Sequence, residues 1–496
     1  MGEMVSRRVF LGGALAGLAS GAWAGAPVRS LVPLRRPDGF SLRTLPGAAD
    51  LIAAANLGGQ VGCVVADARS GRVLEAVNPV RALPPASVVK ALTTAYAFDH
   101  LGPGYRFRTR LIADGRLTDG RLDGDLWLVG GGDPLLDTDA LNDLARDMAE
   151  AGLREITGRF RVAHEALPLI AAIDPDQPMQ VGYNPAVSGL NLNFNRVHFE
   201  WQRGTDGYEI HLDARSHSLR PPVTVSRMQV VDRGAPVYLY EATEEREEWS
   251  VARGALGENG ARWLPVRRPH AYAAEVFQVL ARSRGVVLGA PVFGGTPPDS
   301  GLVMAEHVSD PLEDVLRGMM RWSTNLTAEV AGMLATQASG VRPAGLRQSA
   351  EEMSRWLQER HGLRRLSLVD HSGLGDESRI SAREMVRALV GSGANGNLRR
   401  VMKDIAMRDD RGRPMEDHPV QVVAKTGTLY FVSALAGFAR APSGRDLAFA
   451  IFCGDVDRRT TLDPADETRP RGARSYNARA KALQQALIER WAAVHA

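Results

Sequence analysis

The segment PPASVVKALTTAYAFDHL, residues 84–101, decides the fold. Two prolines stand just before Ser87, where proline suits the first turn of a helix. The following residues place apolar side chains over most of a helical surface, namely Val88, Leu92, Ala95, Tyr96, Phe98 and Leu101. Gly102-Pro103-Gly104 ends this pattern. We therefore expect a buried central helix that begins at Ser87.

Strand patterns lie on both sides of this helix in the sequence. Residues 61–67 and 72–77 have the pattern of a hairpin. The last third contains further apolar runs that predict three consecutive antiparallel strands: 420–424, 431–439 and 447–452. An amphipathic pattern over residues 477–493 predicts a closing helix. The expected fold class is α+β, an antiparallel sheet with helices on both faces.

The middle third of the chain has a different texture. From about residue 105, short apolar runs are broken by glycine and aspartate, and alternating runs such as 197–201 are typical of a two-sided sheet. A chain of 496 residues is also longer than one core usually needs. We expect an export signal, a main domain in two parts and an inserted β-rich part between them, with the bounds 1–26, 27–104 and 268–496, and 105–267.

Three short motifs occur in a fixed order: Ser87-Val-Val-Lys90, Ser323-Thr-Asn325 and Lys425-Thr-Gly-Thr428. On a helix, Lys90 lies one turn after Ser87, so its amine can reach the Ser87 hydroxyl. A lysine with the ordinary pKa of about 10.4 is a poor base at neutral pH. The site must therefore disfavour the charge of Lys90 by burial and by a nearby cation, for which we expect Lys425.

The second motif is expected to move a proton. Ser323 and Asn325 are two residues apart in a short loop between helices, where both side chains can face a cleft. The hydroxyl can pass a proton between Lys90 and a leaving amine, and the amide can hold Lys90 or the substrate backbone.

The third motif is expected to hold the substrate. Lys425 and Thr426 can bind a terminal carboxylate, and Gly427 lets a substrate lie close to the strand as an added β-ribbon. The backbone N–H groups of Ser87 and Thr428 are expected to form an oxyanion hole. The three motifs together predict acyl transfer on a substrate that ends in a free carboxylate.

With these motifs the chain resembles the active-site serine penicillin-binding proteins. It is most similar to the low-molecular-mass D-alanyl-D-alanine carboxypeptidase/endopeptidases of the penicillin-binding protein 4 kind. The separation of 236 positions from Ser87 to Ser323 is similar to the large insertion of that group. Gly130-Gly-Gly-Asp-Pro134 and Asp370-His-Ser-Gly-Leu374 also resemble its subsidiary signatures. The likeness runs from about residue 51 to residue 491.

Two positions depart from the family pattern. His371 stands where the family usually has glycine, and Thr324 where aspartate is common. The middle position of the second motif varies in such enzymes, so we expect activity to be kept. We expect His371 to belong to a turn rather than to catalysis, because no carboxylate pattern marks it as a base.

The resemblance implies a β-lactamase/transpeptidase-like catalytic domain with a large β-rich insertion. It implies that Ser87 attacks the D-Ala-D-Ala bond of peptidoglycan stem peptides or cross-links, and that water resolves the acyl-enzyme. The implied partners are peptidoglycan peptides, with β-lactam antibiotics as covalent inhibitors, and no cofactor and no metal. Whether carboxypeptidase or endopeptidase activity dominates stays open.

Two other functions stay open as alternatives. A serine β-lactamase needs fast deacylation, but we find no Glu-x-x-Leu-Asn-like loop to position the water, so a long-lived penicillin adduct is expected. A catalytically idle cell-wall binding protein could keep the same fold, and the intact motif residues argue against it.

The first residues predict export. Arg7-Arg8 is followed by Phe10 and Leu11, and an apolar stretch leads to an A-x-A site at Ala22-Trp23-Ala24. This pattern resembles the signal of the twin-arginine route, with a general secretory signal as the alternative, and predicts a periplasmic protein. Removing residues 1–26, with Glu3, Arg7 and Arg8, lowers the formal net charge from +3 to +2. Nucleic acid is therefore not an expected partner, and no later stretch is apolar enough to span a membrane.

The two cysteines exclude Cys-x-x-Cys metal and redox motifs. Cys63 and Cys453 both lie in apolar runs, so the favoured interpretation is two buried free thiols. A single disulfide between the first and last strands of one sheet is the alternative, because an oxidising compartment would allow it.

Overall fold

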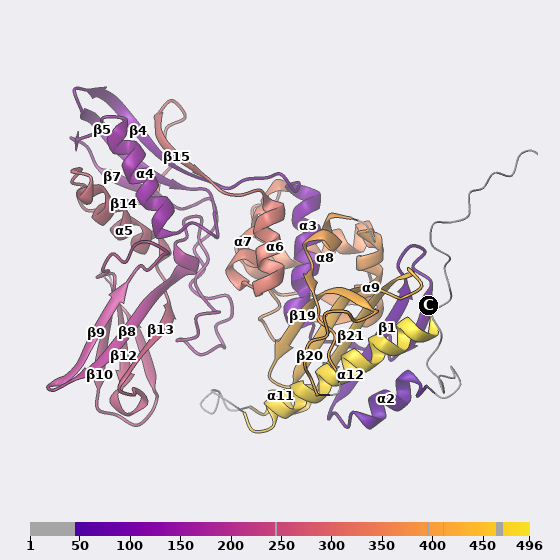
Figure 1. Ribbon diagram of the computed structural model, residues 1–496. Helices are drawn as coiled ribbons and strands as arrows, with labels where there is room; N and C mark the ends of the chain where they lie inside the picture. Colours follow the sequence, from indigo (N-terminus) through magenta and orange to yellow (C-terminus); the bar gives the residue numbers. More distant parts are fainter. Residues whose placement is uncertain (1–44, 244–245, 394–395, 410, 463–469) are drawn as a thin grey trace, which may run out of the picture. The chain divides into compact units, whose positions relative to one another are not determined.

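Strand β1 (Gln60–Asp67) lies inside a six-stranded antiparallel sheet with the order β18-β19-β20-β21-β1-β2 (Figure 1). The other strands are β2 (Val73–Val77), β18 (Lys403–Asp404), β19 (Gln421–Leu429), β20 (Val432–Arg440) and β21 (Asp446–Gly454). The predicted hairpin and the three predicted C-terminal strands are thereby confirmed. The computed structural model describes residues 45–243, 246–393, 396–409, 411–462 and 470–496, and the expected signal at 1–26 lies outside them.

Alternate residues of the central strands face two different cores. On β21, Ala450 and Phe452 belong to one core, whereas Phe449 and Ile451 belong to the other. Helices cover both faces, as predicted from the sequence. The first face carries α3 (Val89–His100), α6 (Leu312–Trp322), α7 (Asn325–Ala338), α8 (Leu346–His361), α9 (Ala382–Gly391) and α10 (Asn397–Val401). The second face carries α2 (Ala48–Ala54) and α12 (Ala473–Val494), and α11 (Val456–Thr460) follows β21.

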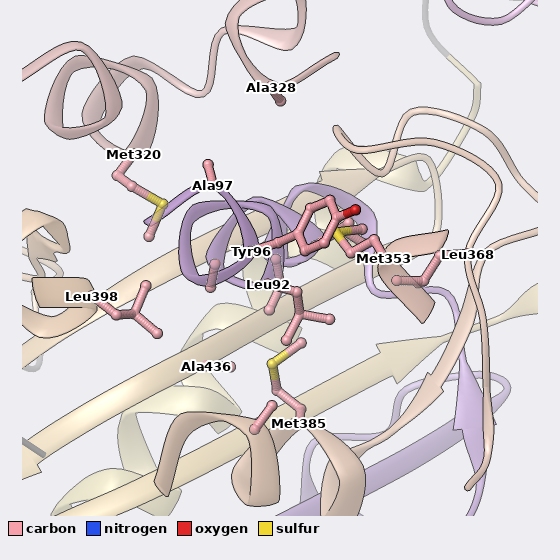
Figure 2. Close-up of a cluster of buried hydrophobic side chains, with 14 of the residues drawn as sticks. Leu92, Tyr96, Ala97, Met320, Ala328, Met353, Leu368, Met385, Leu398 and Ala436 are labelled. Carbon is pink, nitrogen blue, oxygen red and sulfur yellow. The ribbon is translucent and has the colours of Figure 1, made fainter. Parts of the chain in front are cut away.

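Helix α3 is the buried central helix that the sequence predicts. Leu92 and Tyr96 are at most 2% exposed, and Figure 2 shows them among Met320, Met353 and Met385 from three other helices. Full burial of one such apolar side chain stabilises the fold by about 1.5–3 kcal/mol. A short 3-10 turn, η1 (Ala86–Val88), precedes α3, so the first motif spans the junction of η1 and α3.

A small three-stranded sheet connects this junction to a distant segment. Its order is β16-β17-β3, with the bounds β3 (Ala82–Leu83), β16 (Leu366–Ser367) and β17 (Arg379–Ser381). Ile380 pairs with Leu83, only four positions before Ser87. The loop between β16 and β17 is therefore anchored beside η1.

A second core lies in the middle of the chain. Its six-stranded sheet has the order β14-β7-β5-β4-β15, with β6 beside β5, and combines parallel and antiparallel pairs. Helices α4 (Thr138–Glu150) and α5 (Pro269–Ser283) pack in the same core. The strands are β4 (Arg108–Thr118), β5 (Arg121–Gly130), β6 (Glu155–Ile156), β7 (Phe160–Ala163), β14 (Val292–Phe293) and β15 (Leu302–Val308).

Two three-stranded sheets complete this part of the molecule. One has the order β10-β12-β11, with the bounds β10 (Ser226–Val231), β11 (Tyr238–Ala242) and β12 (Glu247–Ala252). The other has the order β13-β8-β9, with the bounds β8 (Arg196–Gly204), β9 (Gly207–Asp213) and β13 (Asn259–Pro265). Short 3-10 turns, η2 (Asn193–Asn195) and η3 (Arg253–Ala255), flank these strands.

We expected the chain to return to the main domain at residue 268, but the structure places this point later. Helix α5 packs in the second core, and β15 pairs with β4 along its length. The chain therefore leaves the second core after β15, at residue 309, rather than at residue 268. Among the described helices, none has both the length and the apolar character that a bilayer span requires.

Helix α7 passes close to the ring of His371 because residue 332 is glycine. A Cβ added at Gly332 would lie 2.2 Å from ring atoms of His371. The His371 side chain is fully buried and its Nε2 lies 2.8 Å from Ser349 Oγ, so the ring has little room to move. The helix and the ring are therefore matched in shape.

Gly332→Ala should destabilise the protein, because overpacking a tight core costs about 1–3 kcal/mol. Gly318→Ala is the matched control, since Gly318 lies on α6 and a Cβ added there meets no atom within 4 Å. That control should stabilise the fold, because alanine favours a helix over glycine by about 1 kcal/mol. Urea unfolding measures both effects, and an equal change in the two variants would contradict the packing argument.

Candidate active site

Ser87 is held in a tight turn against two other segments. The residue before it, Ala86, has φ of +47°, a conformation that non-glycine residues rarely adopt. A Cβ added at Gly427 would lie 2.7 Å from Pro85 O, and one added at Gly373 would lie 1.9 Å from Ala86 O. Both glycines therefore allow backbones from distant parts of the chain to approach the turn that carries Ser87.

The amine of Lys90 has three partners, each from a different part of the chain. Its Nζ lies 3.0 Å from Ser87 Oγ, 2.7 Å from Asn325 Oδ1 and 2.7 Å from Ser372 O. Asn325 Nδ2 donates to Tyr183 O at 2.8 Å, which turns Asn325 Oδ1 toward the amine. The predicted contacts of Lys90 with Ser87 and with Asn325 are thus present.

Lys90 is fully buried, and burial lowers its pKa. The negative charges of Glu329 and Asp370 act in the opposite direction and raise the pKa. We expected burial and the Lys425 cation to lower this pKa together. Burial is the main cause, and the repulsion between the two amines lowers the pKa of Lys425.

Lys425 and Ser323 form a second amine and hydroxyl pair. Lys425 Nζ donates to Ser323 Oγ at 2.9 Å and to Thr426 O at 2.8 Å. Ser323 has φ of +60° at the end of α6, which turns the chain between α6 and α7. Burial lowers the pKa of Lys425 well below its ordinary value, and the cations Lys90 and Lys403 lower it further.

The exposed side chains of the third motif lie on a cavity. Lys425 and Gly427 are buried, whereas Thr426 and Thr428 are exposed, as the alternation of a strand requires. A cavity of about 850 Å³ is lined by residues 426–428, by Lys403 and by residues of α12. The strand thus turns Lys425 toward Ser323 on one face and the two threonines toward this cavity on the other, and Ser87 is not among the residues that line the cavity.

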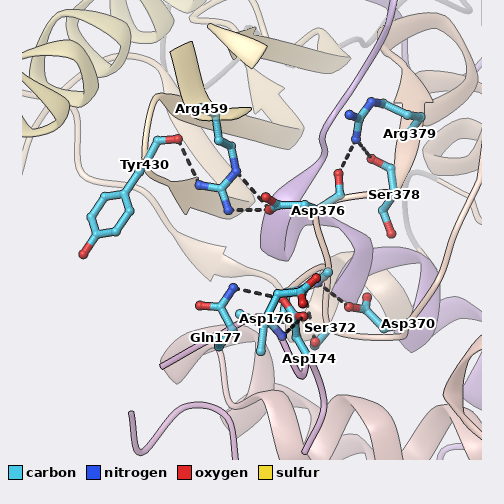
Figure 3. A network of polar contacts seen from close by, with 12 residues as sticks. Asp174, Asp176, Gln177, Asp370, Ser372, Asp376, Ser378, Arg379, Tyr430 and Arg459 are labelled. Carbon is cyan, nitrogen blue, oxygen red and sulfur yellow. Dashed lines mark hydrogen bonds and ion pairs between the residues drawn. The ribbon is translucent and has the colours of Figure 1, made fainter. Parts of the chain in front are cut away.

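The loop that carries the predicted signature Asp370–Leu374 completes the site. Asp370 is buried, and its two carboxylate oxygens accept the N–H groups of Gly373 at 2.6 Å and Gly375 at 2.7 Å. These bonds fix the loop so that Ser372 O faces Lys90. Figure 3 shows Asp370 and Ser372 beside Asp174 and Gln177, which come from the inserted part of the chain.

The side chain of His371 takes no part in these contacts. Its backbone N–H donates to Glu329 Oε2 at 2.9 Å, and its carbonyl oxygen accepts from Thr93 Oγ1 at 2.7 Å. Burial lowers the pKa of the ring to about 3, so the ring is neutral. The assignment of His371 to a turn rather than to proton transfer agrees with these contacts.

The cysteines and one acidic cluster lie outside the site. Cys63 and Cys453 are both free and buried, as the favoured interpretation expected.

Among the described residues, one group has metal-ligand side chains close together, namely His198, Glu200 and Asp213. The Arg215 guanidinium lies 2.8 Å from Glu200 Oε2 and 2.9 Å from Asp213 Oδ2 and neutralises both carboxylates. That group is an ion-pair network within the inserted part.

Known proteins resemble the chain over most of its length. The model of the D-Ala-D-Ala carboxypeptidase 3 (S13) family matches residues 48–470. The D-alanyl-D-alanine carboxypeptidase DacB of Haemophilus influenzae is 25% identical over 468 residues, which cover 86% of this chain and 93% of that protein. The D-alanyl-D-alanine carboxypeptidase of Actinomadura sp. strain R39 is 27% identical over 434 residues, which cover 79% of this chain and 77% of that protein.

A solved structure resembles the fold. The crystal structure of penicillin binding protein 4 (dacB) from Haemophilus influenzae matches with a TM-score of 0.72 at 22% identity, and the match covers 89% of this chain and 99% of that chain. The expected α+β class, with a β-lactamase/transpeptidase-like domain, is therefore confirmed.

The Asp370 contacts predict a loss of stability in Asp370→Asn. An amide has one acceptor oxygen, so its NH₂ group would face one of the two glycine N–H donors, and an unsatisfied buried donor costs about 1–3 kcal/mol. Glu377→Gln is the control, because Glu377 and its partner Arg347 are both exposed, and a surface ion pair contributes at most about 1 kcal/mol. Urea unfolding at neutral pH compares them. Equal losses of unfolding free energy in the two variants would show that the two backbone hydrogen bonds of Asp370 do not stabilise the fold more than a surface ion pair does.

Proposed function

The chain belongs to the D-Ala-D-Ala carboxypeptidase 3 (S13) family, and from this premise we propose that Ser87 is the nucleophile that attacks the D-Ala-D-Ala bond. As a member of that family, the protein is a serine D-alanyl-D-alanine carboxypeptidase. The observation that carries the assignment of Ser87 is the set of three partners around the Lys90 amine.

Those partners give Lys90 the role of general base. A neutral amine has two N–H donors and one lone pair. Asn325 Oδ1 and Ser372 O can only accept, so they take the two N–H groups and leave the lone pair facing the Ser87 hydroxyl. The Ser87 proton moves to Nζ as Oγ bonds to the carbonyl carbon of the substrate, and Lys90 becomes an ammonium.

Ser323 and Lys425 complete the transfer. When the carbon–nitrogen bond of the tetrahedral intermediate breaks, the leaving amine needs a proton. Ser323 Oγ, which is 2.9 Å from Lys425 Nζ, donates its proton to that amine. The proton that Lys90 took from Ser87 makes up this loss, so Lys90 is neutral again before water attacks. Terminal D-alanine leaves, and the acyl group stays on Ser87. Water then attacks this ester by the reverse sequence of proton transfers.

The β19 strand holds the substrate and its developing charge. Thr426 and Thr428 offer hydroxyls, and Lys425 a charge, to the terminal carboxylate. The N–H groups of Ser87 and Thr428 stabilise the oxyanion, where loss of one donor typically costs about 10² to 10³ in rate. The closeness of Gly427 to the Ser87 turn supports this arrangement, because a side chain there would separate strand and nucleophile.

β-Lactam antibiotics fit the same assignment, because they present a carbonyl and a carboxylate to Ser87 and to the strand. Peptidoglycan stem peptides are the natural substrates that we propose. Carboxypeptidase and endopeptidase activity differ in the group that leaves. Incubation with monomeric and with cross-linked muropeptides, followed by separation of the products, distinguishes release of D-alanine from release of a strand.

Incubation with benzylpenicillin should add one penicilloyl group to the protein, on the peptide that contains Ser87. Mass spectrometry of the intact protein and of its peptides measures this, and the adduct should persist because deacylation is slow. Ser87→Ala should carry no adduct, since its side chain has no hydroxyl. Thr94→Ser is a control that changes a hydroxyl residue on α3 and should keep the adduct. An adduct on Ser87→Ala would contradict the assignment of Ser87 as the nucleophile.

We also propose that the chain is exported to the periplasm by the twin-arginine route. Arg7-Arg8 with Phe10 and Leu11 supports this, and an enzyme that acts on peptidoglycan must reach the cell wall.

Arg7→Lys/Arg8→Lys should therefore leave most of the chain unprocessed in the cytoplasm, because that route requires the arginine pair. Arg35→Lys/Arg36→Lys changes a second arginine pair beyond the cleavage site and should be exported normally. Cell fractionation and immunoblotting measure both variants. Export of the first variant at the normal level would instead indicate a general secretory signal.

A further inference from the structure

Glu329 is a buried carboxylate that the mechanism above does not use. It lies on α7, one turn after Asn325, so both side chains are on the same face of the helix. It is fully buried. Its Oε2 accepts the His371 N–H at 2.9 Å, and its Oε1 has no hydrogen-bond partner among the described residues. A buried carboxylate with a free oxygen is costly unless a charge compensates it.

The charged groups around Glu329 come from three other segments. Lys90 on α3 contacts Asn325, one turn before Glu329 on α7. Asp370 lies on the loop before β17, and Lys425 lies on β19. Asp174 acts on Asp370 from the inserted part. Burial raises the pKa of Glu329 and Asp370 raises it further, whereas the Ser372 hydroxyl, the His371 N–H and the charge of Lys90 lower it. His371 lies next to it but is neutral.

The two buried acids differ in what their oxygens do. Both oxygens of Asp370 accept backbone N–H groups, so this carboxylate is committed to the loop. Glu329 accepts one backbone N–H, and the Ser372 hydroxyl is close enough to lower its pKa. Glu329 is also the first of the two charges that raise the pKa of Lys90.

We propose that Glu329 is a positioning residue of the acyl transfer, whose carboxylate is the buried counter-ion of the ammonium that Lys90 forms when it takes the Ser87 proton. This inference rests on the proposed function of Lys90. Glu329 touches neither the substrate nor Ser87 and acts through Lys90. Its bond to the His371 N–H is a separate, structural contribution, because it helps to aim Ser372 O at the same amine.

Glu329→Gln separates the charge from the hydrogen bond, since the amide oxygen can still accept the His371 N–H. Without the carboxylate, the Lys90 ammonium loses a stabilising charge, so the pKa of Lys90 falls and the neutral base persists to lower pH. The acid limb of the pH profile for acylation by benzylpenicillin should therefore move to lower pH by about one unit, the size of shift that one nearby charge produces. Stopped-flow or quenched mass spectrometry from pH 5 to pH 9 measures it.

Two variants test whether the charge is the cause. Glu329→Asp keeps the charge on a shorter side chain, so the acid limb should stay at the wild-type pH even if the rate falls. Thr93→Val removes the hydroxyl that donates to the His371 carbonyl and changes no charge, so it should lower the rate without moving the limb. Thermal unfolding of each variant checks the fold.

An unchanged acid limb in a folded Glu329→Gln protein would overturn the inference, as would an equal shift in Thr93→Val. If Glu329→Gln does not fold, a shifted limb in Glu329→Asp overturns it, whereas an unshifted limb supports it. Failure of the proposed function is distinguishable from all of these results, because the wild-type protein would then form no penicilloyl adduct at Ser87.

Discussion

The structure around the motifs depends on the burial of one amine. Lys90 has no exposed surface, and a buried amine is stable only if its polar partners replace water. Those partners come from residues 87, 325 and 372, which are far apart in the chain. Helix α7, the loop before β17 and the turn η1 must therefore meet at one point. The small sheet β16-β17-β3 and the core around α3 make this meeting possible.

The meeting of these segments also requires that their backbones pack closely. Gly427 and Gly373 lie where a Cβ would collide with the turn that carries Ser87, so strand β19 and the loop can both touch that turn. The face of the sheet beneath α3 is rich in alanine, including Ala434, Ala436 and Ala450, which lets the helix lie close to the strands. The positions of the reactive side chains thus depend on these small residues as well as on the hydrogen bonds of the reactive groups.

Sequence patterns were sufficient for the parts that depend on local periodicity. The central helix, the hairpin and the three last strands follow from alternation and apolar spacing, and Ser87, Lys90 and Asn325 meet as expected. Helix α5 was misassigned because an apolar helix suits either core, and only the distant pairing of β15 with β4 decides between them. Glu329 and Asp370 gave no signal of their role, since an acidic residue is usually exposed and their burial follows from tertiary packing.

The two lysines of the site differ in their charged surroundings, and this difference suits their separate tasks. Lys90 has two buried acids nearby, so its proton affinity is set within the protein. The charged groups that act on Lys425 among the described residues are Lys90 and Lys403, both cations, which disfavour its protonation. Under the proposed function, the terminal carboxylate of the substrate is the counter-ion that Lys425 lacks. Binding of that carboxylate would raise the pKa of Lys425 and prepare it to supply a proton through Ser323. A substrate without a carboxylate would leave Lys425 without this counter-ion, so selection of the substrate and protonation of the leaving amine would depend on the same ion pair.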